Sequence, residues 1–449
     1  MLRRLNPPQI VVVSFLVAIF IGTALLSMPL ATRSGKSQPL LDSLFTATSA
    51  TCVTGLAVRN TGTYFSRFGK AVILVLLQMG GLGIMTFSTL FAIFLGRKLT
   101  IKHDLVIQRT VAANKVQNLA TLIKYILFIT LGIEFLGAAC LALRWATIMD
   151  WSCGRIFANS IFHAISAFCN AGFSLFSTSF RSFLGDPYIN LIMIFLIIIG
   201  GIGFVVILEL PHFLRRKPRY HISIQSKVAL AISAALIFIG AILFFLIEKN
   251  NAMIGLSAKE KVLGSFFQSV TTRTAGFSTF NIGTLATPTL CFFAVLMFIG
   301  ASPGSTGGGI KTCTFGVLLA TFFSMSKNKD RVSLFKRTIP KEVVRKSLVV
   351  VFLALTWIFI AVFLLALVEY KKAAVLDNFF LRMLFEVISA FGTVGLSTGI
   401  TPTLSAAGKL IIIFTMFAGR IGPLTLALAV ALQGDKAIYT YPEEKIMIG

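Results

Sequence analysis

The amino-acid sequence predicts an all-α polytopic membrane protein. In this fold class, four tandem repeats, each a helix, a re-entrant half-helix and a second helix, surround a central pore with pseudo-fourfold symmetry. Three observations predict it: only 13% of the 449 residues are charged, about eight long apolar stretches follow one another, and a short phrase containing glycine recurs four times. Soluble domains carry about 25% charged residues, so an ordinary soluble globule is excluded.

Composition excludes further classes of protein. Hydrophobic residues make up 56% of the chain and the mean hydropathy is +0.88. The 41 basic residues against 16 acidic ones exclude an acidic disordered protein. Because 43 residues are Phe and long polar stretches are almost absent, the net charge of +25 does not indicate nucleic-acid binding. The six Cys form no C-x-x-C pair, which argues against a disulfide framework or a zinc module.

Eight stretches are long enough to cross a membrane, which takes about 20 apolar residues. Two contain charges: Glu134 interrupts residues 118–143, and Lys409 and Arg420 interrupt residues 405–432. The other six contain no Asp, Glu, Lys or Arg: residues 5–32, 71–96, 187–208, 228–247, 274–310 and 347–368. The first stretch is too long for the core of a signal peptide and no A-x-A site follows it, so we expect a retained span.

Basic residues gather in alternate loops, within residues 97–124, 215–227 and 327–346. Since cytoplasmic loops carry an excess of Lys and Arg, we expect these loops and both termini to be cytoplasmic. The location predicted is therefore the plasma (inner) membrane, with eight spans.

Four segments on the opposite side are rich in small residues and too short to cross. Their phrases cover residues 46–56, 166–173, 270–277 and 389–396. A glycine-rich patch follows each phrase at a similar offset, at 80–83, 200–203, 300–309 and 419–422. Because the phrase and the glycine-rich patch recur together four times at similar offsets, they indicate an internal repeat. We expect repeats at 1–100, 101–218, 219–338 with a loop at 301–311, and 339–449 with a short tail.

Both ends of each short segment lie on the same side, so each segment must be re-entrant. We expect half-helices at 40–51, 155–168, 259–272 and 377–391. Asp42, Asn159 and either Asp377 or Asn378 are expected to cap their N-termini. Non-helical backbone at membrane depth is tolerated where it is buried or lines water. Four such segments can meet this condition around one axis.

The repeated glycine suits a cation-binding ring. Backbone carbonyls can replace the hydration shell of a cation, and glycine permits the dihedrals that turn them inward. The C-termini of the half-helices carry partial negative charge, which also favours a cation. A single membrane glycine is more often a helix-packing residue, but four in register are hard to explain that way. The candidate ligands are Gly55, Gly172, Gly276 and Gly395, with flanking Val53, Thr54, Asn170, Ala171, Thr274, Ala275, Thr393 and Val394.

The third inner helix is predicted to break at residues 301–311, because Pro and clustered Gly disfavour a helix. A break at mid-membrane must line a cavity, and broken helices indicate binding or gating sites. The alternative, a nucleotide P-loop, fails because the required G-x-x-x-x-G-K-[ST] spacing is absent. The candidate gate residues are Gly304, Ser305, Thr306, Gly307, Gly308, Gly309, Lys311 and Arg420.

Charged residues at membrane depth are functional candidates. Arg420 either faces the pore and contacts the glycine-rich loop, or it snorkels or forms a structural pair, with Glu386 as the candidate partner. Lys311 is either a gate residue or an anchor at the cytoplasmic end. Arg273 is expected to point behind the ring as a strut, and Glu134 to pair with a basic residue. No enzyme is predicted, since Glu134 and Glu386 form no acidic cluster.

These residues carry a family resemblance. The T-x-G and A-G-F phrases, the fourfold unit and the glycine-rich third inner helix resemble the potassium-translocating subunit of the Ktr system. This subunit belongs to the superfamily of Trk, Ktr and plant HKT transporters. The resemblance covers essentially the whole chain, and the start of the first unit close to Met1 favours the Ktr branch. It implies that the four glycines form a selectivity filter whose carbonyls bind K⁺, and that the broken helix plugs the pore below. Some plant members have Ser at the first position and favour sodium, so Gly55 implies potassium selectivity.

The resemblance implies more about function and partners. It implies gated potassium uptake, with K⁺ as the transported ion, Na⁺ as an activator and no organic cofactor on this chain. A homodimer would sit on a cytosolic nucleotide-binding ring of KtrA-like, RCK-type subunits. The alternative is a tightly coupled Na⁺/K⁺ symporter, but such transporters often show inverted repeats, whereas these run in the same direction.

Overall fold

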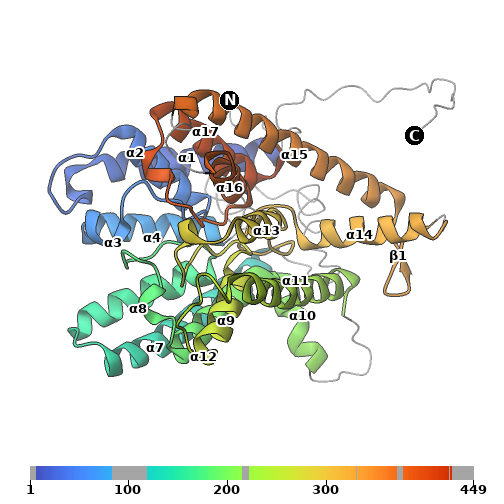
Figure 1. The fold of residues 1–449 in the computed structure, drawn as a ribbon, viewed down its shortest axis with the longest axis horizontal. Coiled ribbons are helices and arrows are strands. Elements are labelled where there is room, and N and C mark those ends of the chain that lie inside the picture. Colours follow the sequence, from blue (N-terminus) through green and yellow to red (C-terminus); the bar gives the residue numbers. More distant parts are fainter. Residues whose placement is uncertain are drawn as a thin grey trace.

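A computed structural model describes residues 7–82, 119–214, 222–329, 331–371, 378–423 and 425–426 of the chain. Within these ranges the protein is almost entirely helical (Figure 1), apart from one two-stranded hairpin, β1 (Ser333–Leu334) paired antiparallel with β2 (Arg337–Thr338). The all-α class predicted from the sequence is therefore confirmed.

Four helices are long and apolar enough to cross a membrane by themselves. They are α1 (Pro7–Ser27), α7 (Leu119–Ile148), α11 (Ile224–Glu248) and α15 (Lys341–Glu369). Each contains most of a predicted span and is followed by a shorter helix that reverses direction. The chain is thus a multi-pass membrane protein, while the total of eight spans stays a prediction because residues 83–118 and most of the C-terminal stretch lie outside the described residues.

The four predicted half-helices are present, with ends within two residues of those expected. They are α2 (Leu40–Thr51), α8 (Cys153–Phe168), α12 (Ala258–Thr271) and α16 (Phe379–Gly392). Between each half-helix and the next inner helix lies a short turn: α3 (Thr61–Tyr64), η3 (Arg181–Phe183), η4 (Ile282–Thr284) or η6 (Thr401–Thr403).

Two of the predicted N-caps, Asp42 and Asn159, were wrong. Asp42 lies inside the first turn of α2 and pairs with Arg59 and Lys409, and Asn159 lies inside α8, where it donates to the carbonyl of Arg155. Asn378 occupies the N-cap position of α16, as predicted, but its side chain makes no cap hydrogen bond. Asp377 lies outside the described residues. The half-helix with a capping box is α12, through Ser257 and Glu260.

The inner helices end or break at their glycine-rich patches. They are α4 (Arg67–Gly81), α9 (Pro187–Ile202), α13 (Thr287–Phe298) and α17 (Ala406–Ile421). The apolar stretch 187–208 does not form one straight helix. After α9, the chain bends by 102° at Gly203, whose φ is +98°, into α10 (Phe204–Leu214). Only glycine adopts this conformation readily, so Gly203 can act as the corner.

The break in the third inner helix is present. An irregular loop, residues 299–311, separates α13 from α14 (Thr312–Ser326). We call it the central loop. It holds itself in place partly through a bridge between Ile299 and Ile310.

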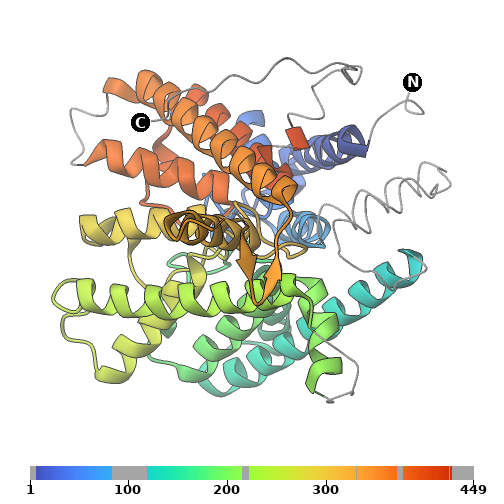
Figure 2. The same cartoon turned by 90° about the vertical axis from the view of Figure 1, so that its right-hand side faces the viewer.

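The elements form four sequential groups around a common centre, which is visible in Figure 2 as blue, cyan, green-to-yellow and orange-to-red helices in rotation. The hydrophobic core is divided in a similar way, because separate buried clusters surround α16 and α17, α2 and α4, α8 and α9, and α11 and α13. The half-helices therefore converge on the middle of the molecule.

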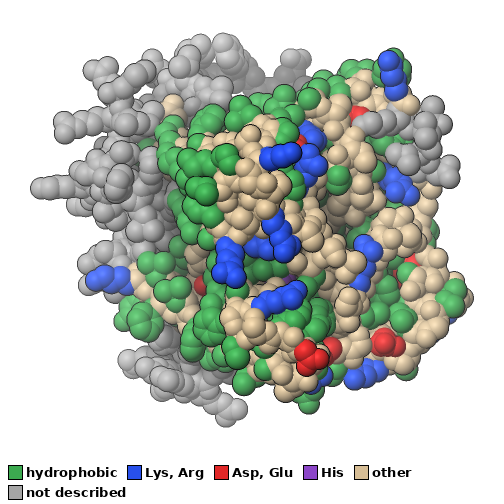
Figure 3. All heavy atoms as spheres, turned by 90° about the vertical axis from the view of Figure 1, so that its left-hand side faces the viewer, with side chains coloured by type: hydrophobic (Ala, Val, Ile, Leu, Met, Phe, Trp, Pro, Cys, Tyr) green, Lys and Arg blue, Asp and Glu red, His purple; other side chains and the backbone are tan. Residues whose placement is uncertain are grey.

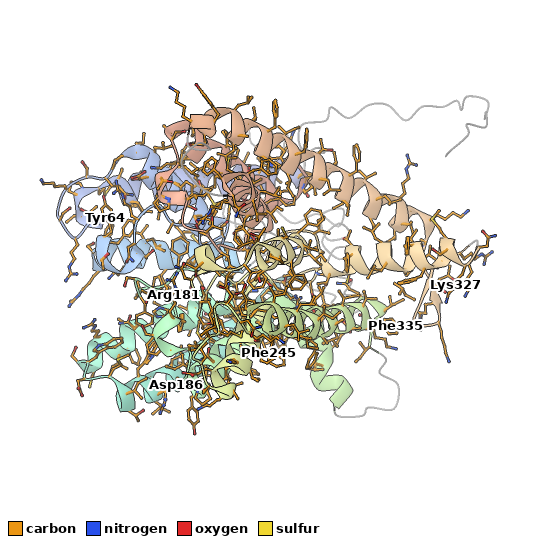
Figure 4. All side chains as sticks on the ribbon, viewed as in Figure 1. Tyr64, Arg181, Asp186, Phe245, Lys327 and Phe335 are labelled. Atoms are coloured by element: carbon orange, nitrogen blue, oxygen red, sulfur yellow. The ribbon has the colours of Figure 1, made fainter. Side chains whose placement is uncertain are left out.

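The two ends of the long axis differ. Tyr64, Arg181 and Asp186 lie toward one end, and Lys327 and Phe335 toward the other (Figure 4). We call these the re-entrant end and the hairpin end. Figure 3 looks onto the re-entrant end, where Lys and Arg side chains lie around the middle of the face.

Candidate functional site

The half-helices end in turns that share one backbone signature. The predicted filter glycines all have positive φ, as do the non-glycine residues two positions earlier. The glycines are Gly55 (+91°), Gly172 (+68°), Gly276 (+79°) and Gly395 (+90°), and the earlier residues are Val53 (+56°), Asn170 (+56°), Thr274 (+70°) and Thr393 (+50°). Positive φ is uncommon outside glycine, and for a β-branched residue such as Val53 it is a clear outlier. The same strained pattern four times indicates one functional geometry.

The four glycines form a closed ring in which each faces the next along the chain. A methyl group placed on Gly55 would lie 2.5 Å from the carbonyl oxygen of Ala171, and one on Gly172 would lie 3.0 Å from that of Ala275. Equivalent methyl groups would lie closer still from Gly276 to the carbonyl oxygen of Val394 and from Gly395 to that of Thr54. The cycle closes, so four carbonyl oxygens and four glycine Cα atoms surround one point.

All eight flanking residues named from the sequence lie in these turns and are buried. The carbonyl oxygens that the ring glycines face belong to the residues just before each glycine: Thr54, Ala171, Ala275 and Val394. A ring of neutral carbonyl oxygens suits a dehydrated monovalent cation. The C-termini of α2, α8, α12 and α16 lie behind it and add partial negative charge.

Serines that the sequence analysis did not single out hold the turns. Gly55 donates its N–H to Ser49 Oγ, and Gly395 donates to Ser389 Oγ, both at 3.1 Å. Ser166 occupies the same position before Gly172 and donates instead to the carbonyl of Phe173, at 2.8 Å. The signal was in the sequence: a serine stands six residues before the ring glycine in three repeats.

The third repeat departs from this pattern. Val270 stands where the others have serine, and Thr271 Oγ1 donates to the carbonyl of Phe277, at 2.6 Å. Arg273 points away from the ring, because its Nη2 donates to Ser233 Oγ of α11 at 2.8 Å. In the third repeat, the turn beside the ring is thus held by α11, the outer helix of that repeat.

The central loop lies directly against the ring. The N–H of Gly308 donates to Thr393 Oγ1 at 3.0 Å, and a methyl group on Gly307 would collide with Thr274 Oγ1. Thr306 Oγ1 donates to the carbonyls of Gly200, at 3.1 Å, and Phe168, at 3.3 Å. The loop therefore contacts the second, third and fourth repeats at once.

Arg420 extends the contacts of the loop to the first repeat. It is buried in α17, and its guanidinium donates to the carbonyl of Thr306 in the loop and to that of Gly80 at the end of α4. Glu386, the other partner considered, instead accepts from the N–H of Thr398 at 2.9 Å and from Thr401 Oγ1 at 2.8 Å. Arg420 is thus a clamp between two repeats and the loop.

Two other charged residues have settled partners. Lys311 Nζ donates to the carbonyl of Gly307 at 2.6 Å, which ties the end of the loop to its middle. Glu134 was expected to pair with a basic residue, but among the described residues its partners are not basic. Its carboxylate accepts from Gln78 Nε2 at 3.1 Å and approaches Cys169 Sγ, which lies three residues before Gly172. Amide and thiol donors keep it at that depth in place of an ion pair.

Within the described ranges, no three His, Cys, Asp or Glu side chains gather to hold a metal ion. The concentrated oxygen ligands at the centre are the backbone carbonyls of the ring. This arrangement can exchange the water around a small cation for peptide oxygens.

Comparison with known proteins agrees with this geometry. A family model described as "Cation transport protein" (TrkH) matches residues 2–439. The chain is 40% identical to Ktr system potassium uptake protein B of Bacillus subtilis, covering 99% of this chain and 97% of the relative. It is 37% identical to potassium/sodium uptake protein NtpJ of Enterococcus hirae, covering 100% and 98%.

A solved structure is also similar. The potassium transporter TrkH from Vibrio parahaemolyticus superposes with a TM-score of 0.68 at 20% sequence identity, covering 93% of this chain and 84% of that one. At this identity the match supports the fold alone.

Proposed function

This chain belongs to the TrkH family of cation transport proteins, and on that premise we propose that it is a potassium-selective uptake pore. The K⁺ site is the ring of carbonyls around Gly55, Gly172, Gly276 and Gly395, and the central loop with Arg420 is the gate. Inward K⁺ flow is driven by the membrane potential, which is worth about 2.3 kcal/mol per charge per 100 mV.

One observation carries the assignment of the filter: the glycines face one another in a closed cycle with repeated positive φ. A side chain at a ring position would press on a neighbouring carbonyl, strongly at Gly55, Gly276 and Gly395 and less at Gly172. Discrimination between ions of different size then depends on how far the backbone of the ring can shift. The hydrogen bonds that Ser49 and Ser389 accept from Gly55 and Gly395 oppose such shifts.

The proposed gate acts by displacement of the loop. Thr306, Gly307 and Gly308 are buried among the repeats, which is the arrangement of a closed pore. Opening requires the hydrogen bonds of Arg420, Thr306 and Gly308 to break. The positive side chain of Lys311, at the end of the loop, also raises the electrostatic barrier to a cation that passes the loop.

Further features remain part of the proposal. Repeats at 1–100, 101–218, 219–338 and 339–449 each supply one quarter of the pore. Both termini and the hairpin end are cytoplasmic, and a cytosolic RCK-type ring regulates a homodimer of this chain. The names of two relatives support K⁺ as cargo, and one includes sodium, which supports Na⁺ as an activator.

The second candidate is a tightly coupled Na⁺/K⁺ symporter, which the potassium/sodium name of one relative favours. Potassium flux into proteoliposomes separates the two. An Na⁺-activated pore conducts K⁺ passively when Na⁺ is present on both sides, and it carries no Na⁺ along. A symporter moves Na⁺ with K⁺ in a fixed ratio.

The test of the filter is rubidium and sodium uptake by potassium-starved cells expressing Gly276→Ser. We expect the ratio of rubidium to sodium uptake to fall at least about tenfold, equivalent to about 1.4 kcal/mol of lost discrimination. The matched control is Gly399→Ser, because Gly399 also has positive φ (+94°) but faces open space. Unchanged selectivity in the ring variant, or an equal loss in both, would contradict the proposal.

A further inference from the structure

A pocket at the hairpin end has no role in the proposed pore. It has a volume of about 470 Å³ and lies between the hairpin and the start of α15. We call it the hairpin pocket. Its cations are Arg331, Lys341 and Arg345, and most of its remaining lining is apolar, including Ile339, Val344 and Leu348.

The three cations have no acidic partners within the described ranges. The nearby carboxylate of Glu342 pairs with Lys346, at 2.6 Å, one residue beyond Arg345. The pocket lining itself contains three positive side chains and no acidic one. Charge complementarity therefore selects an anion, and Arg in particular binds the oxygens of a phosphate.

The apolar part of the pocket continues along one face of α15. Lys341, Arg345, Leu348, Phe352 and Phe359 follow one another at spacings of three, four or seven residues, which places them on one stripe. Beyond the pocket the stripe is exposed: Phe352 is 71% and Phe359 is 72% accessible. Because α15 is long and apolar enough to cross the membrane, we place this face in the hydrocarbon.

The stripe has the dimensions of a lipid. Arg345 and Phe359 are 14 residues apart, roughly 20 Å along a helix, and one leaflet contributes roughly 15 Å of hydrocarbon. We propose that the hairpin pocket binds the phosphate headgroup of an anionic phospholipid, whose acyl chain lies along the Leu348–Phe359 face of α15. A soluble anion would use the cations but not this stripe, and a soluble protein partner would have to enter the hydrocarbon to use it.

The test is native mass spectrometry of the full-length protein, first depleted of lipid and then titrated with phosphatidylglycerol or with phosphatidylcholine of the same acyl chains. We expect the first bound phosphatidylglycerol to be at least fivefold more occupied than phosphatidylcholine. The combined variant Arg331→Gln, Lys341→Gln and Arg345→Gln should lose that preference. The matched control, Lys327→Gln, Lys329→Gln and Lys336→Gln, removes the same charge from exposed positions outside the pocket and should keep it.

A second arm identifies the source of the phosphate. Leu348→Ser should lower phosphatidylglycerol occupancy, and soluble glycerol phosphate at millimolar concentration should not displace the lipid. Equal losses in the two triple variants, no preference between the lipids, or displacement by glycerol phosphate would overturn the proposal. The assay involves no ion flux, so its failure would leave the proposed pore intact.

Discussion

The glycine ring and the central loop that lies against it differ in symmetry. At the ring, four turns with the same signs of φ come from four parts of the chain. One level below, a single segment, the central loop, contacts the others, and one arginine completes the set. Symmetry suits a site that must surround an ion evenly, whereas an asymmetric element can move without dismantling the site.

Glycine packing shows where the symmetry ends. In three repeats a glycine of the inner helix lies against the carbonyl at the end of a half-helix: Gly80 on Thr51, Gly200 on Phe168 and Gly419 on Phe391. In the third repeat, Gly300 lies instead against the carbonyl of Gly308 in its own loop. In the third repeat, this glycine therefore contacts the central loop in place of the end of its own half-helix.

The largest expected effect comes from removing Arg420, the side chain that holds the central loop against the other repeats. Arg420→Gln should raise potassium flux in the absence of regulatory subunits by at least about tenfold, because each hydrogen bond from a charged group contributes about 1.5–3 kcal/mol and two are lost. Flux through proteoliposomes measures this. Arg420→Lys, which keeps the charge but can form fewer bonds, should fall in between. Unchanged flux in Arg420→Gln would show that the loop is not held shut by this residue.

A second comparison uses two glycines of the ring itself. Gly395→Ala should reduce selectivity for potassium over sodium more than Gly172→Ala. A methyl group on Gly395 overlaps the carbonyl oxygen of Thr54, whereas one on Gly172 lies 3.0 Å from its nearest neighbour. Competition of sodium against rubidium uptake ranks the variants, with Gly399→Ala as the control for positive φ. The reverse order would show that contact across the ring does not determine selectivity.

The smallest effect tests how the ring is held. Ser389→Ala removes the acceptor of the Gly395 N–H and should lower the free energy of unfolding by about 1 kcal/mol, with a modest loss of selectivity. The third repeat has Val270 in place of this serine. Val270→Ser should not raise the free energy of unfolding by an equivalent amount, because Thr271 already holds that turn. Thermal unfolding in detergent and the uptake ratio provide the two readouts. A loss of stability in Ser389→Ala without any change in selectivity would contradict the proposed coupling.

Local signals in the sequence predicted the half-helices and the break in the third inner helix well. A short apolar segment, followed by small residues and a glycine, specifies where a helix must stop, and Pro303 with its neighbouring glycines specifies where the inner helix must break. The ring glycines were predictable because the same phrase occurs four times.

Features that depend on packing between distant segments were not predictable. The partners of Arg420 are backbone carbonyls, which every residue offers, so no residue type marked Gly80 in advance. Glu134 was assigned a basic partner by charge alone, yet Gln78 and Cys169 reach it through the meeting of α7, α4 and α8. Likewise, a glycine-rich patch predicts a weak point in a helix but not the 102° bend at Gly203.

The central claim is that one cation binds at the middle of the glycine ring, held by peptide oxygens. Anomalous diffraction from crystals soaked in rubidium or thallium tests it most directly. The account predicts a single strong peak within ligand distance of the carbonyls of Thr54, Ala171, Ala275 and Val394, and its loss in Gly276→Ser. A heavy-ion peak elsewhere in the membrane region, with no density inside the ring, would contradict it.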